Sequence, residues 1–398
     1  MESKIKKLCK INKNSIKKDN YPNIIEYLDT KNLVNGEFKD IIKLNRISDK
    51  IPSRAKRIVQ KNDILISTVR PNQKHFGFIT NKQSNYIVST GFAVITPNQN
   101  LVNPYYLYKY LTLEKVTNYL QNIAENSTSA YPSIKPSILG ELSIDLPSRS
   151  IQNFIANIFK KIDDKIEINK KIIANLEELS QTIFKHWFID FEFPNQRNSP
   201  YNYNRKETSK DLPHGWKWEK LNHLFKINYG KNLPTKNLLD TGYPVYGGNG
   251  KIGYYSNYMY DDPKILISCR GAASGAIHVS QEHSFITNNS IVLDEIEKEY
   301  FYYFKELFSR ETFKRYTTGS AQPQITIVNI KELKFLVPPK SLVIEFNKHQ
   351  KPIFDFNSKL KQENSKLKSL RDTLLPKLMS GEIEIPDDIE VNMDELSI

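Results

Sequence analysis

The chain has 398 residues, 39% hydrophobic and 11% aromatic, which is enough for two or more domains with packed cores. Its formal net charge of +13 favours a polyanionic partner such as nucleic acid. No apolar run approaches the roughly 18 residues of a membrane span. Two distant cysteines argue against a disulfide framework and favour a reducing cytoplasm, and the basic N-terminus lacks the apolar stretch of a signal peptide.

Residues 1–147 predict a first globular domain. Short apolar runs predict strands at residues 24–28, 63–67 and 87–95, the last interrupted at Gly91. Pro104 begins a predicted helix, and Asn103 before it suits a helix cap. The Asn-Pro-Tyr-Tyr sequence here lacks the second proline of the amino-methyltransferase signature Asn-Pro-Pro-Tyr, so capping is the better interpretation.

Basic and hydroxyl side chains lie between these predicted strands. Arginine can pair bidentately with guanine, and serine or asparagine can contact bases or phosphates. Any single lysine here is more simply interpreted as a solvated surface side chain than as a DNA contact. For the arginines both interpretations, a solvated side chain and a DNA contact, stay open. The candidate DNA-binding residues of this domain are Arg54, Arg57, Arg70, Lys74, Ser127 and Ser129.

Residues 148–193 lack glycine and repeat apolar residues every three or four positions, which predicts a long central helix. Over about five or six heptads this pattern indicates two helices packed along their length, each roughly 60 Å long. An ordinary core helix is the alternative, but helices above about 25 residues are uncommon outside coiled coils and repeats. The residues expected to pack on a partner are Ile155, Ile162, Leu176, Ile183 and Trp187.

Residues 194–211 have few aliphatic side chains and predict a connector to a second globular domain, residues 212–339. Its stretch 246–255 resembles a phosphate cradle but is not a P-loop, because Val245 and Ile252 replace the required Gly and Ser or Thr. Residues 300–313 predict an aromatic-rich helix that is mostly core. The candidate DNA-binding residues are Lys231, Asn249, Lys251, Arg270, Asn288, Ser320 and Gln322.

A second long helix is predicted at residues 340–381. Pro338 suits its entrance and Gly381 its end, whereas Pro352 predicts a kink or a later start. The expected packing residues are Phe346, Ile353, Leu360, Leu367 and Leu374. The tail, residues 382–398, has seven acidic and no basic residues, so the rest of the chain carries +20 against +13 for the whole.

The two halves of the chain are similar. Residues 142–147 match 333–338 and residues 129–132 match 320–323 at a spacing of 191, while residues 64–67 match 265–268 at a spacing of 201. We therefore predict an α+β fold in which two similar α/β domains are separated by two long antiparallel helices that form a coiled coil, with an internal pseudo-twofold repeat.

The motifs of common catalytic sites are missing from the sequence. The seven histidines show no HExxH or paired metal spacing, two cysteines cannot build a zinc finger, and no G-x-S-x-G elbow occurs. His186 beside Trp187 at a helix end is better interpreted as a packing or partner contact than as a catalytic base. These observations favour a binding or targeting protein that is not an enzyme and holds no metal.

Taken together, two similar globular parts that are each followed by a long helix resemble the DNA-specificity (S) subunit of Type I restriction–modification enzymes. The supporting stretches are residues 27–30, 52–57, 63–71, 212–216, 246–250 and 319–323. The likeness covers nearly the whole chain, and the duplicated architecture makes it specific. It departs from the family at residues 127–132, which contain no glycine.

The resemblance implies two target recognition domains, each reading half of a split site in double-stranded DNA. The helices would set the unread spacer and dock methyltransferase subunits, with motor–nuclease subunits joining for cleavage. S-adenosylmethionine, ATP and Mg would bind to those partners and no cofactor to this chain. Two other hypotheses stay open: a coiled-coil assembly scaffold without sequence readout, and an enzyme with an unrecognised active site.

Overall fold

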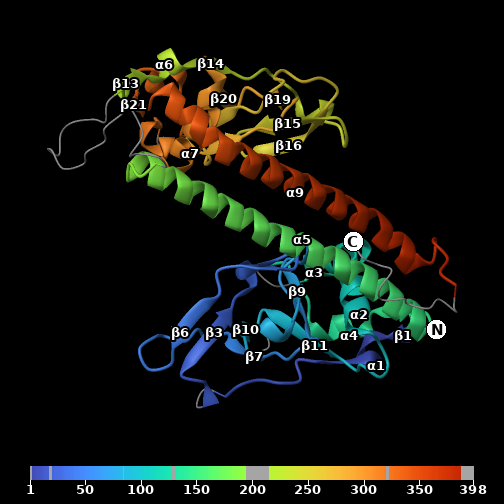
Figure 1. The fold of residues 1–398 in the computed structure, drawn as a ribbon. Coiled ribbons are helices and arrows are strands. Elements are labelled where there is room, and N and C mark those ends of the chain that lie inside the picture. The colour runs from blue at the N-terminus through green and yellow to red at the C-terminus, as the bar shows by residue number, and fades with distance from the viewer. Residues whose placement is uncertain are drawn as a thin grey trace. The chain divides into compact units, whose positions relative to one another are not determined.

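The computed structural model describes residues 2–17, 20–83, 85–127, 131–193, 215–319 and 322–386. It divides into two compact units, Met1–Ile168 with Asn364–Ile398, called unit 1, and Asn169–Glu363, called unit 2. Each unit contains one globular domain and parts of two long helices (Figure 1). Ser129, Ser320, the connector at residues 194–211 and the tail from residue 387 lie outside the described residues.

The first domain contains two four-stranded sheets. One has the order β2 (Cys9–Ile11), β11 (Phe92–Pro97), β8 (Ile64–Ser67) and β9 (Phe76–Phe78), all antiparallel. The other has the order β6 (Ile42–Asn45), β3 (Ile24–Leu28), β10 (Ile87–Ser89) and β7 (Ala55–Ile58), in which β10 runs parallel to β3. The predicted break at Gly91 is confirmed, because β10 and β11 lie on either side of it and belong to different sheets.

The second domain repeats this plan. Its antiparallel sheet has the order β14 (Phe225–Tyr229), β20 (Ser290–Glu295), β17 (Ile265–Ser268) and β18 (Ile277–Val279). A three-stranded sheet has the order β16 (Gly250–Tyr255), β15 (Tyr243–Gly247) and β19 (Phe285–Ile286), with β19 parallel to β15. Two ribbons also match, β1 (Glu2–Lys4) with β12 (Ser143–Asp145) and β13 (Lys217–Lys220) with β21 (Lys334–Val337). The predicted internal repeat is confirmed, although the sheet that contains a parallel pair has four strands in the first domain and three in the second.

Short helices complete both domains. In the first they are α1 (Ile5–Leu8), α2 (Pro104–Leu111), α3 (Glu114–Glu125) and α4 (Pro136–Glu141), and in the second α6 (Leu221–Leu224), α7 (Phe301–Arg310) and α8 (Ile327–Ile330). The Asn103 side chain accepts hydrogen bonds from the backbone N–H groups of Tyr105 and Tyr106, which confirms the predicted cap. The aromatic residues of α7 are mostly core, as predicted, and Phe304 and Phe308 are fully buried.

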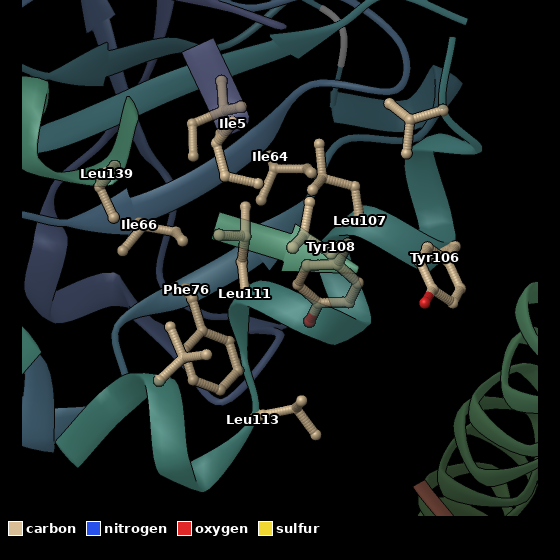
Figure 2. Packing of buried hydrophobic residues seen from close by; sticks show 14 of the residues in the cluster. Ile5, Ile64, Ile66, Phe76, Tyr106, Leu107, Tyr108, Leu111, Leu113 and Leu139 are labelled. Atoms are coloured by element: carbon tan, nitrogen blue, oxygen red, sulfur yellow. The ribbon is translucent and has the colours of Figure 1, made fainter. Parts of the chain in front are cut away.

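Apolar side chains from β8, β9 and α2 meet in the core of the first domain (Figure 2). Ile64 and Ile66 alternate with Leu65 on the pleated strand β8, so they face this core while Leu65 faces a second cluster. All four residues of β8 are buried, as are those of the matched strand β17. A strand with both faces covered explains why both matched runs are apolar rather than alternating.

The helix α5 (Arg149–Phe184) continues as a π-helix over Lys185–Ile189, so the helical part ends before residue 193. The helix α9 (Lys340–Ser380) is 41 residues long and includes Pro352, so the predicted later start at Pro352 is wrong. Proline removes one backbone hydrogen bond of α9. The residues of α9 before and after Pro352 pack along α5, and this packing keeps α9 continuous. Gly381 follows the helix with φ 76°, the left-handed conformation of a C-terminal glycine.

The two long helices pair antiparallel in both units. In unit 2, Asn169 Nδ2 donates to Glu363 at 2.8 Å and Lys361 Nζ lies 2.9 Å from Glu177. In unit 1, Arg371 Nη1 lies 3.1 Å from Asp163. Within these pairs the residue number on α9 falls as the residue number on α5 rises, which is the pattern of antiparallel helices. The predicted packing residues are all buried or half-buried; the fully buried ones are Ile155, Ile162, Trp187, Phe346, Leu360 and Leu367. No helix in the described ranges is long and apolar enough to cross a bilayer.

A buried charge cluster lies at the start of β17 and the end of β20 in the second domain. Lys264 Nζ is 2.8 Å from Asp294 Oδ1 and 3.3 Å from Glu295 Oε2. Lys264 and Glu295 are both buried. Burial raises the pKa of Glu295 to about 7, even though Lys264 opposes the shift. Glu295 Oε1 has no hydrogen-bond partner among the described residues.

We expect the stability of the protein to fall as pH rises from about 4.5 to about 7, because the unfolded chain ionises Glu295 more readily than the folded one. The protonated Glu295 contributes about 3 kcal/mol to the free energy of unfolding. This contribution is present in full below the pKa of Glu295 in the unfolded chain and is lost as pH rises through its pKa in the folded protein. Urea unfolding of the wild type and of Glu295→Gln between pH 4 and 8 measures it. If the difference between the two proteins does not change with pH, Glu295 is not protonated in the fold.

Candidate nucleic-acid interface

Five backbone segments meet where β17 ends in the second domain. The Ser268 hydroxyl donates to the Gly248 carbonyl in the turn between β15 and β16. Cys269 N donates to Asn289 O at 3.0 Å, and Gly271 N donates to Pro323 O at 3.0 Å. Lys231 N donates to Ile286 O at 2.9 Å, and Asn288 N donates to Lys231 O at 3.1 Å. These bonds hold the loops near residues 231, 248, 270, 288 and 323 next to one another.

The sequence-predicted residues of this domain gather on those loops. Lys231, Asn249, Lys251, Arg270 and Gln322 are exposed and Asn288 is half-buried. Lys251 Nζ lies 4.0 Å from the centre of the Tyr254 ring, a cation–π contact that orients the ammonium. The result is an exposed surface with three cations and three amide side chains, which suits phosphate and base-edge contacts. Ser320 lies outside the described residues.

Glycine is required where these loops approach most closely. A Cβ on Gly230 would lie 2.3 Å from Thr287 O, and Gly250 has φ +88°, a conformation that other residues rarely adopt. The glycine-rich stretch at residues 246–255 is a hairpin of β15 and β16 with Asn249 at its turn. A strand follows the turn where a P-loop would have a helix, which agrees with the sequence-based exclusion of a P-loop.

The first domain has a corresponding set of loops at the end of β8. Thr68 N donates to Gly91 O at 2.8 Å, Arg70 N donates to Pro132 O at 2.9 Å, and Thr90 N donates to Arg54 O at 2.8 Å. Arg54 and Arg70 are both exposed there. The Arg70 guanidinium lies 5.1 Å from the centre of the Tyr131 ring, so it is placed beside the loop that leads into α4.

Three other candidates of the first domain have structural partners. Arg57 is half-buried, donates to Ser15 Oγ at 3.3 Å, and has a pKa lowered by burial. Lys74 Nζ is 2.6 Å from Glu114 on α3. Ser127 Oγ accepts a bond from Ser133 N at 3.4 Å, so it supports the loop. The geometry thus favours Arg54 and Arg70 as DNA contacts over Arg57 and Lys74, while Ser129 is outside the described residues.

Arg70 and Arg270 do not occupy equivalent positions. Arg70 N and Gly271 N bond to Pro132 and Pro323, which match at the repeat spacing of 191, so Arg70 corresponds to Gly271. Both have left-handed backbones, with φ 48° for Arg70 and 74° for Gly271. A non-glycine residue rarely adopts this conformation, and Arg270 one position earlier has an ordinary one. The two arginines are therefore offset by one residue within the repeat, as the spacing of 201 between the matched strands also indicates.

The structure places three further residues beside these loops as candidates, namely Thr30 and Thr90 in the first domain and Asn289 in the second. A Cβ on Gly91 would lie 2.9 Å from Thr30, and Asn289 is exposed beside Arg270. Thr30 closely follows β3 and Thr90 closely follows β10. These two strands pair in parallel, so both segments leave the sheet at the same edge. Parallel pairing of these strands is the signal that places them together, and it is not visible in a single sequence. Among the described residues, no three His, Cys, Asp or Glu side chains are grouped to hold a metal ion.

The duplicated loop surface agrees with a family model that describes the Type I restriction modification DNA specificity domain. That model matches residues 1–178 and residues 213–373, well over half of the chain. The chain belongs to this family. The two matched ranges correspond to the two halves of the structural repeat, each a domain followed by part of a long helix.

Several relatives resemble the chain over most of its length. It is 26% identical to the Type I restriction enzyme HindI specificity subunit of Haemophilus influenzae, covering 91% of this chain and 95% of the relative. It is 27% identical to the MjaIX specificity subunit of Methanocaldococcus jannaschii, covering 91% and 88%. The crystal structure of a Type-I restriction-modification system S subunit from M. genitalium matches with a TM-score of 0.60, 19% identity and 95% coverage of both chains, which supports the fold.

Proposed function

We propose that this chain is the DNA-specificity subunit of a Type I restriction–modification complex and that each globular domain reads one half of a bipartite DNA site. The observation behind the proposal is that corresponding loops gather at the ends of β8 and β17, on two copies of one fold, and expose Arg70 in the first domain and Arg270 in the second. Exposed arginine and amide side chains discriminate bases by about 1–3 kcal/mol for each bidentate pair. The net positive charge supplies the sequence-independent, salt-dependent part of binding.

The long helices α5 and α9 act as a ruler between the half-sites. Both are continuous, 36 and 41 residues long, and each contributes residues to both units. Half-sites read from one side of a duplex must be separated by a matching number of turns of about 34 Å each, so a spacer of fixed length is selective. The outer faces of the helices would dock methyltransferase subunits, and motor–nuclease subunits would join for cleavage.

Chemistry in this assembly belongs to the partner subunits. We propose that S-adenosylmethionine, ATP and Mg bind there, and that this chain is not itself an enzyme. Its part is to bind double-stranded DNA and to place the methyltransferase subunits at a defined sequence. Mapping methylated adenines in cells that contain this gene and its neighbours tests the whole proposal, because it yields both half-sites and the spacer together. A reconstituted complex without sequence preference would contradict it.

Arg270→Ala is expected to weaken discrimination at one base pair of the second half-site by about 1–3 kcal/mol while leaving the first half-site unaffected. Competition binding of the reconstituted complex to DNAs substituted at each half-site position measures this. Lys226→Ala is the matched control, because Lys226 is exposed on β14 opposite Asp294, away from the loops. A scaffold without readout predicts instead that Arg70→Ala and Arg270→Ala leave binding unchanged and that substitutions on the helix faces abolish assembly.

A further inference from the structure

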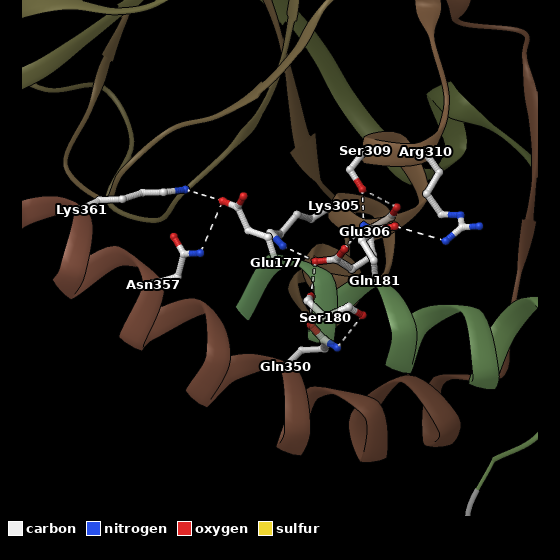
Figure 3. A network of polar contacts seen from close by, with 10 residues as sticks. All are labelled: Glu177, Ser180, Gln181, Lys305, Glu306, Ser309, Arg310, Gln350, Asn357 and Lys361. Carbon is white, nitrogen blue, oxygen red and sulfur yellow. Dashed lines mark hydrogen bonds and ion pairs between the residues drawn. The ribbon is translucent and has the colours of Figure 1, made fainter. Parts of the chain in front are cut away.

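A polar cluster is buried where α5, α7 and α9 meet in unit 2 (Figure 3). Ser180 on α5, Glu306 on α7 and Gln350 on α9 are 2%, 1% and 1% exposed. Ser180 Oγ lies 2.5 Å from Glu306 Oε1 and 2.5 Å from Gln350 Oε1. The Gln181 amide and the Lys305 ammonium also contact Glu306, so its carboxylate is surrounded by donors.

The cluster joins the second domain to both long helices at one point. α7 is part of the domain, whereas Ser180 and Gln350 belong to the two helices. The surrounding contacts are aromatic, with Phe346 packed on Phe184 and Phe188. Apolar contacts of this kind tolerate small shifts between elements, but a buried carboxylate must keep its donors. The polar cluster therefore permits one placement of α7 on the helix pair and disfavours neighbouring ones.

Buried polar residues continue along α9 at the heptad interval. Gln350, Asn357 and Asn364 are seven residues apart and are 1%, 8% and 7% exposed. In unit 2, Asn357 Nδ2 donates to Glu177 on α5 at 3.4 Å. A polar residue at a buried seam position selects one register of paired helices at some cost in stability. The seam of α9 is thus built for a unique register rather than for maximal apolar burial.

We propose that Ser180, Gln350 and Glu306 are positioning residues that determine which DNA spacer length the protein accepts. The inference rests on the proposed function, in which the helix pair holds both domains on one duplex. Adding one base pair to the spacer moves the second half-site by about 3.4 Å and rotates it by about a tenth of a turn. A domain held in one placement cannot follow that displacement, whereas a domain held by apolar contacts alone can shift toward it.

The test is the double variant Ser180→Ala/Gln350→Leu, which leaves Glu306 with its Gln181 and Lys305 partners. Methylation is measured with the complex of full-length chain and methyltransferase subunits, on DNAs whose spacers have the mapped length or are one base pair shorter or longer. For each protein, the measured quantity is the methylation rate on an altered spacer divided by the rate on the mapped spacer. We expect this ratio to be about tenfold higher for the double variant than for the wild type. Base preferences within both half-sites should not change.

Gln362→Leu is the matched control, since it places leucine at an exposed position of α9 and should retain the wild-type spacer preference. A double variant that assembles and discriminates spacers as the wild type does overturns this inference and leaves the proposed function intact. If the double variant does not assemble, Gln350→Leu alone, which keeps the Ser180–Glu306 contact, is measured, and an unchanged spacer preference there overturns the inference. A wild-type complex that shows no base preference contradicts the proposed function itself.

Discussion

Asp163→Ala is expected to lower the free energy of unfolding by about 3–5 kcal/mol, because it leaves a buried ammonium group without its partner. Asp163 on α5 contacts Lys109 of α2, whose side chain is 6% exposed. Tyr105 Oη donates to the same carboxylate at 2.6 Å, and Arg371 Nη1 on α9 lies 3.1 Å away. This cluster in unit 1 joins the first domain to both long helices, so its loss also loosens the docking of that domain.

The pKa of Asp163 decides how this effect depends on pH. Burial opposes ionisation, but Lys109, Tyr105 and Arg371 together hold the pKa of Asp163 below its usual value. A depressed carboxyl pKa contributes stability above the unfolded pKa and loses it as pH falls through the folded one. The difference between the wild type and Asp163→Ala should therefore be largest at neutral pH and shrink below about pH 4.

Chemical denaturation of both proteins at pH 7 and pH 3 measures this difference, and Asp164→Ala is the matched control. Asp164 is the neighbouring residue on α5, exposed, and paired only with the exposed Lys160 at the next helical turn in the part of the chain described. An exposed pair of this kind contributes about 0.3–0.5 kcal/mol. Equal losses for the two variants would show that the Lys109 site is solvated and that no buried ion pair exists.

Phe346→Ala should destabilise the protein by about 3–5 kcal/mol, because it removes a ring from a closely packed site and leaves a cavity. The Phe346 side chain is fully buried, and its ring centre lies 4.8 Å from that of Phe188 and 5.6 Å from that of Trp187. These rings belong to α9 and to the π-helical segment Lys185–Ile189 that continues α5, so the site joins the two long helices within unit 2. The loss should appear as a lower urea midpoint with a similar dependence on urea concentration.

Phe356→Ala provides the comparison for this prediction, since Phe356 lies on the same helix but is 47% exposed. A surface substitution of this kind should change stability by about 0.5 kcal/mol or less. We propose that a methyltransferase subunit docks on the outer face of α9, where Phe356 is exposed. Phe356→Ala should then weaken assembly without destabilising the isolated chain, and a loss of stability equal to that of Phe346→Ala would contradict the packing described here.

The periodicity of apolar residues was sufficient to identify the two long helices. Ile155, Ile162, Phe346 and Leu360 follow helical spacing because one face of each helix is covered by the other, and burial of that face determines the residue types. The effect of Pro352 was not predictable from local rules. A proline costs one hydrogen bond locally, whereas contacts along the whole of α9 decide whether the helix continues.

The candidate interface was found in part from local patterns. Arg54, Arg70 and Arg270 follow strand or turn signals, and all three side chains are exposed, so their contact with DNA stays a prediction. The sequence could not show that Arg57 is half-buried or that Lys74 pairs with Glu114, forty residues away in the chain. Whether a basic side chain is available to DNA depends on neighbours that folding brings from distant segments.

By itself, the sequence determined the duplicated architecture, the two amphipathic helices and the positive charge, because repetition, periodicity and composition are properties of the chain before it folds. Tertiary structure alone decided the meeting of Ser180, Glu306 and Gln350. That outcome depends on helix packing and register, in which residues more than a hundred positions apart must satisfy each other's hydrogen bonds in a dry interior.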